Sequence, residues 1–289
     1  YLKERQIKSA SIKKFRLGYA PNSWQTVTKF LEKKEYSKSD IVKAGLAIEG
    51  KKDSSIYDRF RGRIIFPIFN PAGRVVGFSS RILPEYDDGQ MGKYINSPDA
   101  PIFNKSKILY GYHFGRDAIR EEKKAILVEG QTDVITSSQA GFENTIATSG
   151  TALTENQLKM IDRIANQIIF AYDQDSAGQR ATRRGIDLAL KENLEVRIVL
   201  IPGKYQDVDE VIRAKPELWQ KALKDSKEII DYYFSHTIPK DTSKLSANQK
   251  RKIGQTLVKQ ITKLGDPIAQ GDWLQKLSER LRVDPQYLY

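Results

Sequence analysis

Cysteine is absent from this 289-residue chain, and histidine occurs only twice, at His113 and His236. The lack of cysteine excludes disulfides, thiol catalysis, iron–sulfur clusters and cysteine-based zinc sites. Two histidines leave little room for a histidine-rich metal site or for a catalytic triad. Any catalysis therefore has to depend on carboxylates.

Long apolar runs are missing too. None approaches the roughly 20 residues needed to cross a bilayer, and the first residues, Tyr-Leu-Lys-Glu-Arg, lack the apolar region of a signal peptide. We therefore expect no membrane partner and an intracellular, cytoplasmic protein. Because the chain starts with Tyr1 and not with Met, we also expect it to be an excerpt of a longer protein.

Acidic residues are fewer than basic ones, with 36 Asp and Glu against 48 Lys and Arg, and the formal net charge is +12. A basic surface suits a polyanionic partner, although charge alone is a weak indication of nucleic-acid binding. The length is sufficient for two or three subdomains. We expect an N-terminal α+β part at residues 1–120, a central α/β part at 121–212 and a helical part at 213–289.

The N-terminal part has helical patterns up to about residue 55, followed by the alternation typical of a β-hairpin. Strands are expected at 63–69 and 74–78, with the turn Asn70-Pro71-Ala72-Gly73 between them. Basic and aromatic residues interleave around this hairpin, a pattern that can hold phosphates and stack bases or simply form a solvated sheet face. The basic residues are Lys51, Lys52, Arg59, Arg61, Arg63, Arg74 and Arg81, and the aromatic ones are Tyr57, Phe60 and Phe78.

The central part alternates short apolar runs with helical patterns, which predicts the α/β class, a parallel sheet flanked by helices. The expected strands are 125–128, 144–148, 167–172 and 195–201, and the expected helices are 133–140, 154–164 and 177–191. Thr154 and Gln157 form a capping-box pattern at the start of the second helix. The tail is expected to be helical to its end, with a helix start at Pro216 and breaks at 265–267 and 284–285.

Carboxylates follow two of the expected strands at the point where each one ends. Glu129 follows the first strand, and Asp173 and Asp175 follow the third. Functional groups of parallel sheets collect at the carboxyl ends of the strands, so these three side chains could converge. Three adjacent carboxylates need a neutralising cation, and their hard oxygen atoms suit Mg²⁺ or Mn²⁺. Asp133, at the start of the next helix, is placed to cap that helix.

An Asp-x-Asp pair by itself is a weak signal. A helix–loop–helix Ca²⁺ site is excluded here, because Ala177 and Arg184 occupy positions that need ligands and a strand precedes the loop. The pair also fits an aspartyl phosphatase, but the Thr or Val usually found two residues after the second Asp is missing. Capping of the following helix would explain one Asp on its own. The stretch 45–52 nearly matches a phosphate-binding loop but fails at Lys52, and we interpret it as chance.

The carboxylates together are more specific than any one of them. Glu129-Gly130-x-x-Asp133, Gly150-Thr151 and Asp173-x-Asp175-x-Ala177-Gly178 resemble the Toprim domain, the metal-binding α/β module of bacterial primases, type IA and II topoisomerases and some nucleases. Further segments resemble the RNA polymerase domain of bacterial DnaG-type primases, from the first residues to about Glu210. These segments are 15–21, 57–68, 76–78, 93–98, 109–111, 128–135 and 149–154.

The resemblance implies a primase catalytic core that makes short RNA primers on single-stranded DNA from nucleoside triphosphates. It implies that Glu129 and Asp173 hold one Mg²⁺ or Mn²⁺ ion and that Asp173 and Asp175 hold a second. Asp207 and Asp209 would complete the site, directly or through water. Residues matching the basic ridge, which grips nucleotide and template, are Arg81, Lys93, Asn96 and Lys105, with help from Arg59, Arg61 and Arg63.

Several positions depart from the family pattern, which bears on nucleotide fit and rate. Gln131 stands where the family usually has Tyr, Gln174 where it usually has Gly, and Ser79-Ser80 where it usually has two glycines. The Asp207-Val208-Asp209 motif has Val in place of Pro and an insertion before it. The family's zinc-binding and helicase-binding segments are not recognisable, so we expect poor primer initiation by this chain alone and little binding of the replicative helicase.

Two other functions remain open at this point. A Toprim nuclease or topoisomerase fragment would cleave DNA with the same metals, although no sequence feature marks out a nucleophile among the 14 tyrosines. A single-strand DNA-binding module with an inactive metal site is the non-enzymatic alternative, and the intact Glu129, Asp173 and Asp175 argue against it.

Overall fold

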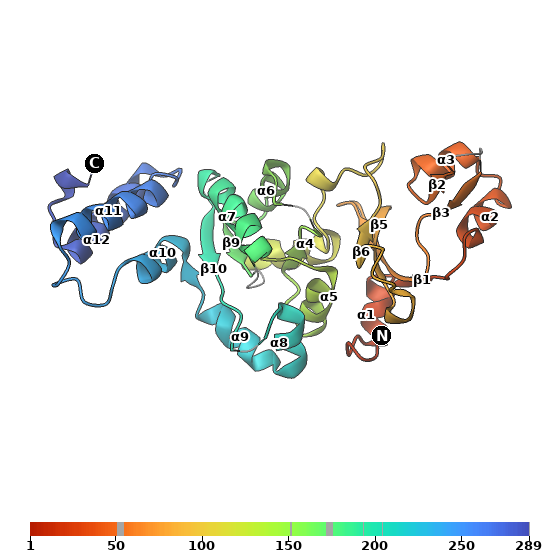
Figure 1. The fold of residues 1–289 in the computed structure, drawn as a ribbon, viewed down its shortest axis with the longest axis horizontal. Coiled ribbons are helices and arrows are strands. Elements are labelled where there is room, and N and C mark those ends of the chain that lie inside the picture. The colour runs from red at the N-terminus through yellow and green to blue at the C-terminus, as the bar shows by residue number, and fades with distance from the viewer. Residues whose placement is uncertain (51–54, 151, 172–175, 193, 204, 289) are drawn as a thin grey trace. The chain divides into compact units, whose positions relative to one another are not determined.

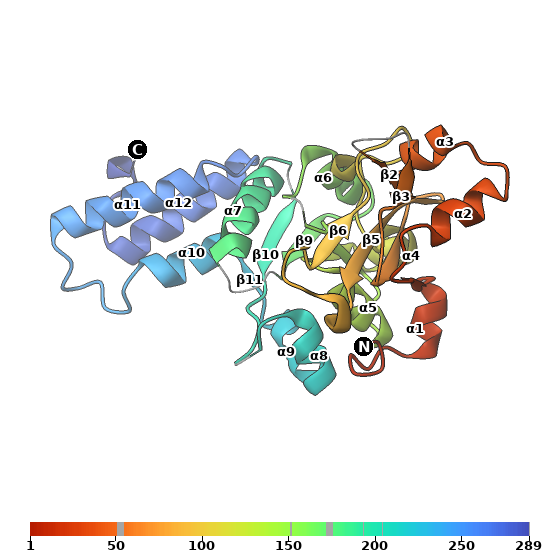
Figure 2. The same ribbon diagram turned by 45° about the vertical axis from the view of Figure 1, so that its right-hand side comes forward.

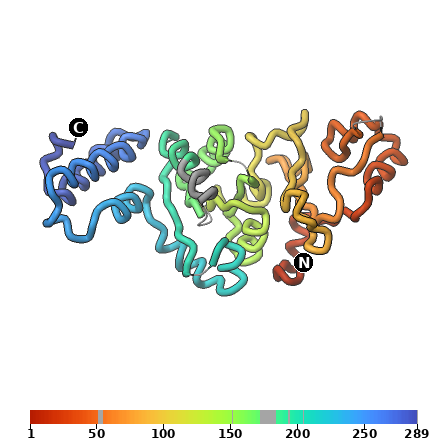
Figure 3. Tube along the Cα trace, viewed as in Figure 1, coloured from red at the N-terminus to blue at the C-terminus, as the bar shows by residue number. Residues whose placement is uncertain are grey.

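The computed structural model describes residues 1–50, 55–150, 152–171, 176–192, 194–203 and 205–288 (Figures 1 and 3). The chain divides into two units, each built from two stretches of sequence. The first comprises Tyr1–Ala118 and Glu129–Thr151, and the second Ile119–Val128 and Ala152–Tyr289. Both combine helices with strands, which confirms the predicted α/β class. The division into three subdomains stays a prediction.

The first unit contains short helices around antiparallel strands. Its elements are α1 (Ser9–Lys14), β1 (Gly18–Ala20), α2 (Thr26–Glu32), α3 (Lys38–Lys43), β2 (Ala47–Glu49), β3 (Ile56–Asp58), β4 (Arg63–Phe69), β5 (Val75–Ile82), η1 (Pro84–Tyr86), β6 (Tyr94–Asn96), η2 (Lys105–Lys107), α5 (Gln131–Gln139) and β8 (Thr145–Ala147), and α4 (Tyr112–Glu122) begins in it. The predicted strand at 144–148 and the helix at 133–140 are confirmed as β8 and α5.

A four-stranded sheet in the order β1-β4-β5-β6 forms the centre of this unit. The β4–β5 hairpin is the one predicted from sequence, and it pairs from Arg63 opposite Ile82 to Phe69 opposite Val75. Its turn is closed by the Asn70 side-chain oxygen, which accepts a hydrogen bond from the Arg74 amide at 3.0 Å. Gly73 has φ of +80°, a conformation that favours glycine. The turn chemistry in the sequence therefore set the register of this hairpin.

A smaller two-stranded hairpin, β2–β3, is covered by α2 and α3 (Figure 1). Ile41 of α3 packs with Ala47 and Ile56 in its buried core. Asp58, the last residue of β3, accepts hydrogen bonds from the Val27 and Thr28 amides with its two carboxylate oxygens, at 2.7 and 2.8 Å. One buried carboxylate thus caps α2 and ties it to this hairpin.

The second unit contains a parallel sheet and a helical tail (Figure 2). Its elements are β7 (Lys124–Val128), α6 (Glu155–Asp162), β9 (Gln167–Phe170), α7 (Ser176–Lys191), β10 (Glu195–Ile198), α8 (Val208–Ala214), α9 (Pro216–Lys224), β11 (Lys227–Glu228), α10 (Ile229–Thr237), α11 (Ala247–Ile261), α12 (Pro267–Leu281) and η3 (Pro285–Tyr287). Thr154 and Gln157 form the predicted capping box of α6. Pro216 begins α9, and Asp266 caps α12 at the predicted break.

The parallel strands of this unit end level with one another. Leu127 of β7 pairs with Phe170 of β9, and Phe170 pairs in turn with Ile198 of β10. The prediction of a tail that is helical to its end is wrong at β11, which pairs with β10 in antiparallel register. A two-residue strand has no periodicity to read, and it forms because the edge of β10 offers unpaired backbone groups. Within the described part of the chain, no helix has the length and apolar content needed to cross a membrane.

Candidate functional site

Glu129 lies directly after β7, at the sharp turn into α5. The turn is stabilised by Asp133, whose carboxylate accepts a hydrogen bond from the Gly130 amide at 3.0 Å. The predicted capping role of Asp133 is confirmed. A Cβ atom on Gly130 would lie 3.0 Å from the same oxygen, so a side chain at this position would displace the Asp133 carboxylate by a few tenths of an ångström. The Glu129 side chain, half-buried, is therefore carried on a rigid turn.

A buried hydrogen bond connects the start of α5 to β5. The Gln131 side-chain amide donates to the Ser79 hydroxyl at 2.8 Å, and both residues are almost fully buried. Two positions that depart from the DnaG pattern are thus direct partners. Gln131 is two residues from Glu129, and Ser79 is two residues from Arg81, so the bond holds the acidic turn and the basic strand in fixed register.

Arg81 is held between aromatic rings. Its guanidinium carbon lies 4.3 Å from the centroid of the Tyr1 ring and 5.9 Å from that of Tyr94, and only 8% of the residue is exposed. Burial, followed by the neighbouring Tyr1, raises the pKa of Tyr94 to about 12. A cation beside an aromatic ring is a favourable contact, so the two tyrosine rings help to hold the Arg81 guanidinium in place.

Asn96 and Lys105 both line a small cavity of about 20 Å³, together with Thr148 and Ser149. The Asn96 amide donates to the Ser149 carbonyl at 3.2 Å, where the chain turns through two left-handed residues, Ser149 at φ +58° and Gly150 at φ +83°. The structure thus brings two predicted nucleotide-binding residues next to the turn at Ser149 and Gly150. Lys93, just before β6, is exposed.

The three arginines of the 59–63 segment differ in their surroundings. Arg63 is buried and donates to the carbonyls of Gly92 and Lys93 at 3.0 and 3.3 Å, so it supports the sheet. Burial lowers the pKa of the half-buried Arg59 guanidinium. Arg61 is partly exposed, and its guanidinium lies against the rings of Trp24 and Tyr57.

The predicted acids of the second unit have structural roles in this structure. Asp207 caps α8, accepting a hydrogen bond from the Glu210 amide at 2.7 Å. Asp209 is fully buried and accepts from Arg213 Nε at 3.0 Å. This ion pair holds the Asp209 carboxylate in one orientation. The participation of Asp207 and Asp209 in a metal site stays a prediction.

Asp173 and Asp175 lie outside the described residues. Among the residues that the structure describes there is no group of three acidic or histidine side chains placed to hold a metal ion. Since two of the five predicted ligands lie outside that part of the chain, the metal site stays a prediction. Its donor set consists of carboxylates only, which fits Mg²⁺ or Mn²⁺.

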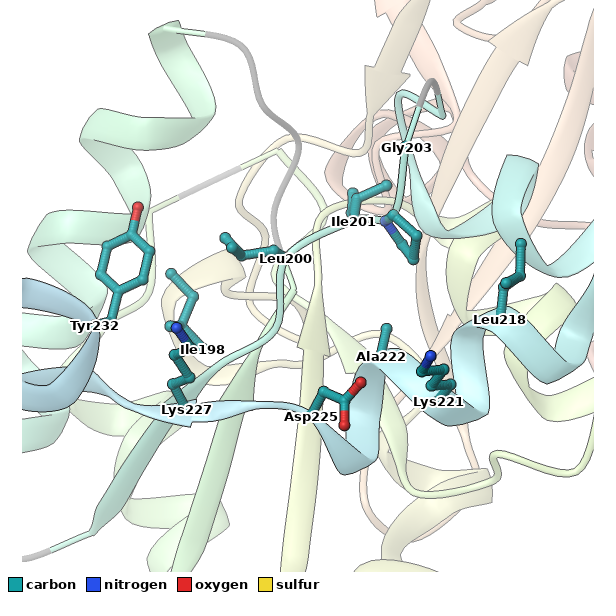
Figure 4. Close-up of a pocket in the computed structure, with 11 residues that line it drawn as sticks. Ile198, Leu200, Ile201, Gly203, Leu218, Lys221, Ala222, Asp225, Lys227 and Tyr232 are labelled. Carbon is teal, nitrogen blue, oxygen red and sulfur yellow. The ribbon is translucent and has the colours of Figure 1, made fainter. Parts of the chain in front are cut away.

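A pocket of about 460 Å³ opens beyond the end of β10 in the second unit (Figure 4). Leu200 and Ile201 line it between Tyr232 of α10 on one side and Leu218 of α9 on the other (Figure 4). Two lysines, Lys221 and Lys227, and one acid, Asp225, add charged groups to these mostly apolar walls. The pocket lies at the carboxyl end of the parallel strands, where α/β sheets bind ligands.

One surface feature had no counterpart in the sequence-based site. Trp24, which precedes α2, lies over the guanidinium of Arg61 with a centroid distance of 4.1 Å. The two residues are far apart in sequence, and no local motif connects them. The available signal was a Trp within a polar stretch, Asn22-Ser23-Trp24-Gln25, since a helix start does not require an aromatic ring.

Two family models match parts of the chain. Residues 1–116 match the family described as the DNA primase catalytic core, N-terminal domain, and residues 126–212 match the Toprim-like family. A DNA primase of Clostridium acetobutylicum is 34% identical over 293 residues, which include the whole chain. The chain belongs to the family of DnaG-type primase catalytic cores.

Solved structures of primase catalytic cores share the fold. A DNA primase domain from Pseudomonas aeruginosa has a TM-score of 0.85 and 29% identity, covering 100% of this chain and 89% of that one. A DnaG primase catalytic domain bound to single-stranded DNA has a TM-score of 0.84 and 28% identity, covering 99% and 89%. The chain spans about half the length of the curated primases it matches, 47% for the Clostridium acetobutylicum protein.

Proposed function

We propose that this primase core synthesises short RNA primers on single-stranded DNA from nucleoside triphosphates and releases pyrophosphate. The observation that carries the proposal is the group formed by Asn96, Lys105 and the Ser149-Gly150 turn in the first unit. An amide and an ammonium group at a turn of exposed backbone suit the recognition of a nucleotide. The solved relative that binds single-stranded DNA supports DNA as the template.

Different residues of this chain would bind the metal ions, the nucleotide and the template. Glu129, together with Asp173, Asp175, Asp207 and Asp209, would hold two Mg²⁺ or Mn²⁺ ions. When bound, such ions neutralise charge on the triphosphate and lower the pKa of the attacking hydroxyl group. Lys105 and Asn96 would bind and orient the nucleotide, and Arg81 and Lys93 would contact phosphates of nucleotide or template.

The test is primer extension with the full 289-residue chain. Labelled nucleoside triphosphates, Mg²⁺ or Mn²⁺ and an RNA-primed DNA template are incubated with the wild type, with Glu129→Gln and with Glu85→Gln as the control. Glu85 is an exposed acid of the same unit, in η1, so this variant loses the same charge away from the site. We expect extension by the wild type and by Glu85→Gln, and a loss of about 100-fold or more in Glu129→Gln.

The other outcomes decide between the remaining functions. Cleavage of the template without RNA synthesis indicates a Toprim nuclease. Binding of DNA without either product, in wild type and both variants alike, indicates a non-catalytic binding module. Equal extension by wild type and Glu129→Gln contradicts the assignment of Glu129 to the metal site.

A further inference from the structure

The pocket beyond β10 lies where the chain leaves the parallel sheet. The Val199 amide still donates to the Phe170 carbonyl at 3.0 Å, whereas residues 200–203 pair with no strand in the described part of the chain. On its other edge, β10 is paired only with β11, which begins at Lys227, opposite Ile198. An open space of about 460 Å³ therefore remains beside this segment (Figure 4), and all of its lining residues belong to the second unit.

The walls of this pocket are mostly aliphatic. Leu200 is one of the lining residues, and 53% of it is exposed, although Val199 and Ile201 on either side of it are buried. Leu218 and Ala222, which lie four residues apart on one face of α9, also line the pocket. A single exposed leucine is ordinary, but here it adjoins other apolar side chains around an open space. A ligand that covered these side chains would remove apolar surface from water.

Three charged side chains line the same pocket. Lys221 lies in the last turn of α9, Asp225 follows that helix, and Lys227 begins β11. Within the described ranges, no ion pair includes any of the three. Two ammonium groups against one carboxylate leave a net positive charge beside the apolar walls.

We propose that this pocket binds a small organic anion. The apolar body of the ligand packs on Leu200 and Leu218, and its carboxylate or sulfonate group pairs with Lys221 or Lys227. Ligand pockets typically enclose about 300–1,000 Å³, with mainly apolar walls and a few polar groups that fix the orientation of the ligand. This pocket has a volume within that range and the same division between apolar and charged groups.

The pocket is separate from the proposed primase site. None of the described residues assigned to metal, nucleotide or template binding lines it. A nucleotide also fits it poorly, because aliphatic walls would leave polar groups of the base and ribose without hydrogen-bond partners. Two lysines would offset only part of the charge of a triphosphate. The proposal therefore goes beyond primer synthesis and does not depend on it.

Two fluorescent dyes provide a matched pair of probes. Anilinonaphthalene sulfonate is an organic anion, and N-phenylnaphthylamine has the same aromatic body without the sulfonate group. Each dye is titrated into the 289-residue chain while its emission is recorded. We expect each dye to saturate one site per chain. We also expect decanoate, an anion with an acyl body, to displace both of them.

Lysine variants test the charged part of the site. The double variant Lys221→Ala with Lys227→Ala should raise the dissociation constant of the sulfonate dye about fivefold and change that of the neutral dye by less than about twofold. Lys215→Ala with Lys224→Ala is the matched control. It also removes two exposed lysines, from the two ends of α9, and neither of them lines the pocket.

A leucine variant tests the apolar part. Leu200→Ser should raise the dissociation constants of both dyes about fivefold, because both lose the same apolar contact. Ile268→Ser is the control, since 83% of this residue at the start of α12 is exposed and it lies outside the pocket. Thermal melting of each variant checks that the fold is intact.

Four results overturn the proposal. The first is binding of the sulfonate dye without a saturable site. The second is a double lysine variant that binds this dye normally or loses both dyes equally. The third is unchanged affinity in Leu200→Ser, or an equal loss in Ile268→Ser. The fourth is displacement of the dyes by ATP and not by decanoate, which would assign the pocket to a nucleotide.

Discussion

At the scale of single residues, the burial of Tyr110 predicts how the free energy of unfolding depends on pH. The side chain is buried, and among the described residues its hydroxyl has no hydrogen-bond partner. Burial raises the pKa of Tyr110, so the folded state keeps its proton at a pH where the unfolded chain, with a pKa near 10, loses it. The contribution of the protonated Tyr110 to the free energy of unfolding is therefore complete below about pH 10, and it falls as the pH rises further.

We expect Tyr110→Phe to remove this part of the alkaline destabilisation. The free energy of unfolding of the wild type should fall relative to the variant by about 1.4 kcal/mol per pH unit above pH 10. Urea unfolding at a series of pH values from 8 to 11 measures the difference, and the values at pH 8 serve as the internal control. If the free energies of unfolding of the two proteins changed in parallel above pH 10, the assignment of this destabilisation to Tyr110 would be contradicted.

Residue roles set by local spacing could be predicted from sequence, and roles set by distant contacts could not. The cap formed by Asp133 follows from its position three residues after Gly130, and the structure has that bond. The Ser79–Gln131 bond joins residues 52 positions apart. In the sequence, Ser79 and Gln131 are two separate departures from the family pattern. Only the folded structure shows that they bind each other.

At the scale of elements, this bond couples β5 to α5. Ser79→Gly should leave the buried Gln131 amide without its partner and cost about 1–3 kcal/mol of unfolding free energy. Gln131→Tyr should overfill the space beside Ser79 and cost about 1–3 kcal/mol. The double variant restores the usual family pair, so we expect its cost to be smaller than the sum by about 0.5–3 kcal/mol.

Urea unfolding of the four proteins measures this coupling. Ser80→Gly is the matched control, because the Ser80 hydroxyl donates to the Ile95 carbonyl rather than to Gln131. Its effect should add to that of Gln131→Tyr within about 0.5 kcal/mol. Additivity of Ser79→Gly and Gln131→Tyr within the same limit would show that the bond does not couple the two elements.

Most elements of the fold could be predicted because their signals are local. The β4–β5 hairpin has turn residues Asn70 and Gly73 in the positions that the turn requires. Thr154 and Gln157 mark the start of α6 in the same way. β11 could not be found, since its two residues pair only because the edge of β10 is nearby.

At the scale of the whole molecule, the net charge of +12 predicts that DNA binding depends on salt. For single strands, log K falls with log salt by about 0.7 for each phosphate contact. Lys93→Ala should therefore reduce the slope by about 0.7, whereas Lys244→Ala, which alters an exposed lysine in the loop after α10, should leave it unchanged. Fluorescence anisotropy of labelled oligothymidylate at several salt concentrations measures both slopes. Equal slopes in wild type and Lys93→Ala would exclude a phosphate contact at Lys93.

The division of the chain into two units could not be predicted from the sequence. A change from a strand-rich to an α/β pattern near residue 120 suggests a boundary there, but nothing local assigns 129–151 to the same unit as the N-terminal hairpins. That assignment depends on contacts such as the one between Asn96 and Ser149, which are 53 residues apart. The predicted metal ligands follow a family spacing that can be read in the sequence, and their role stays a prediction.

The discontinuous first unit has a consequence for how the protein is made. A ribosome that has released Ala118 has not yet supplied α5 or β8, and it must first produce Ile119–Val128, which belong to the other unit. At about 5–20 residues per second, the nascent N-terminal part waits several seconds for its last elements. During this time Ser79 and Asn96 lack their partners, so the growing chain presents an unfinished surface to chaperones.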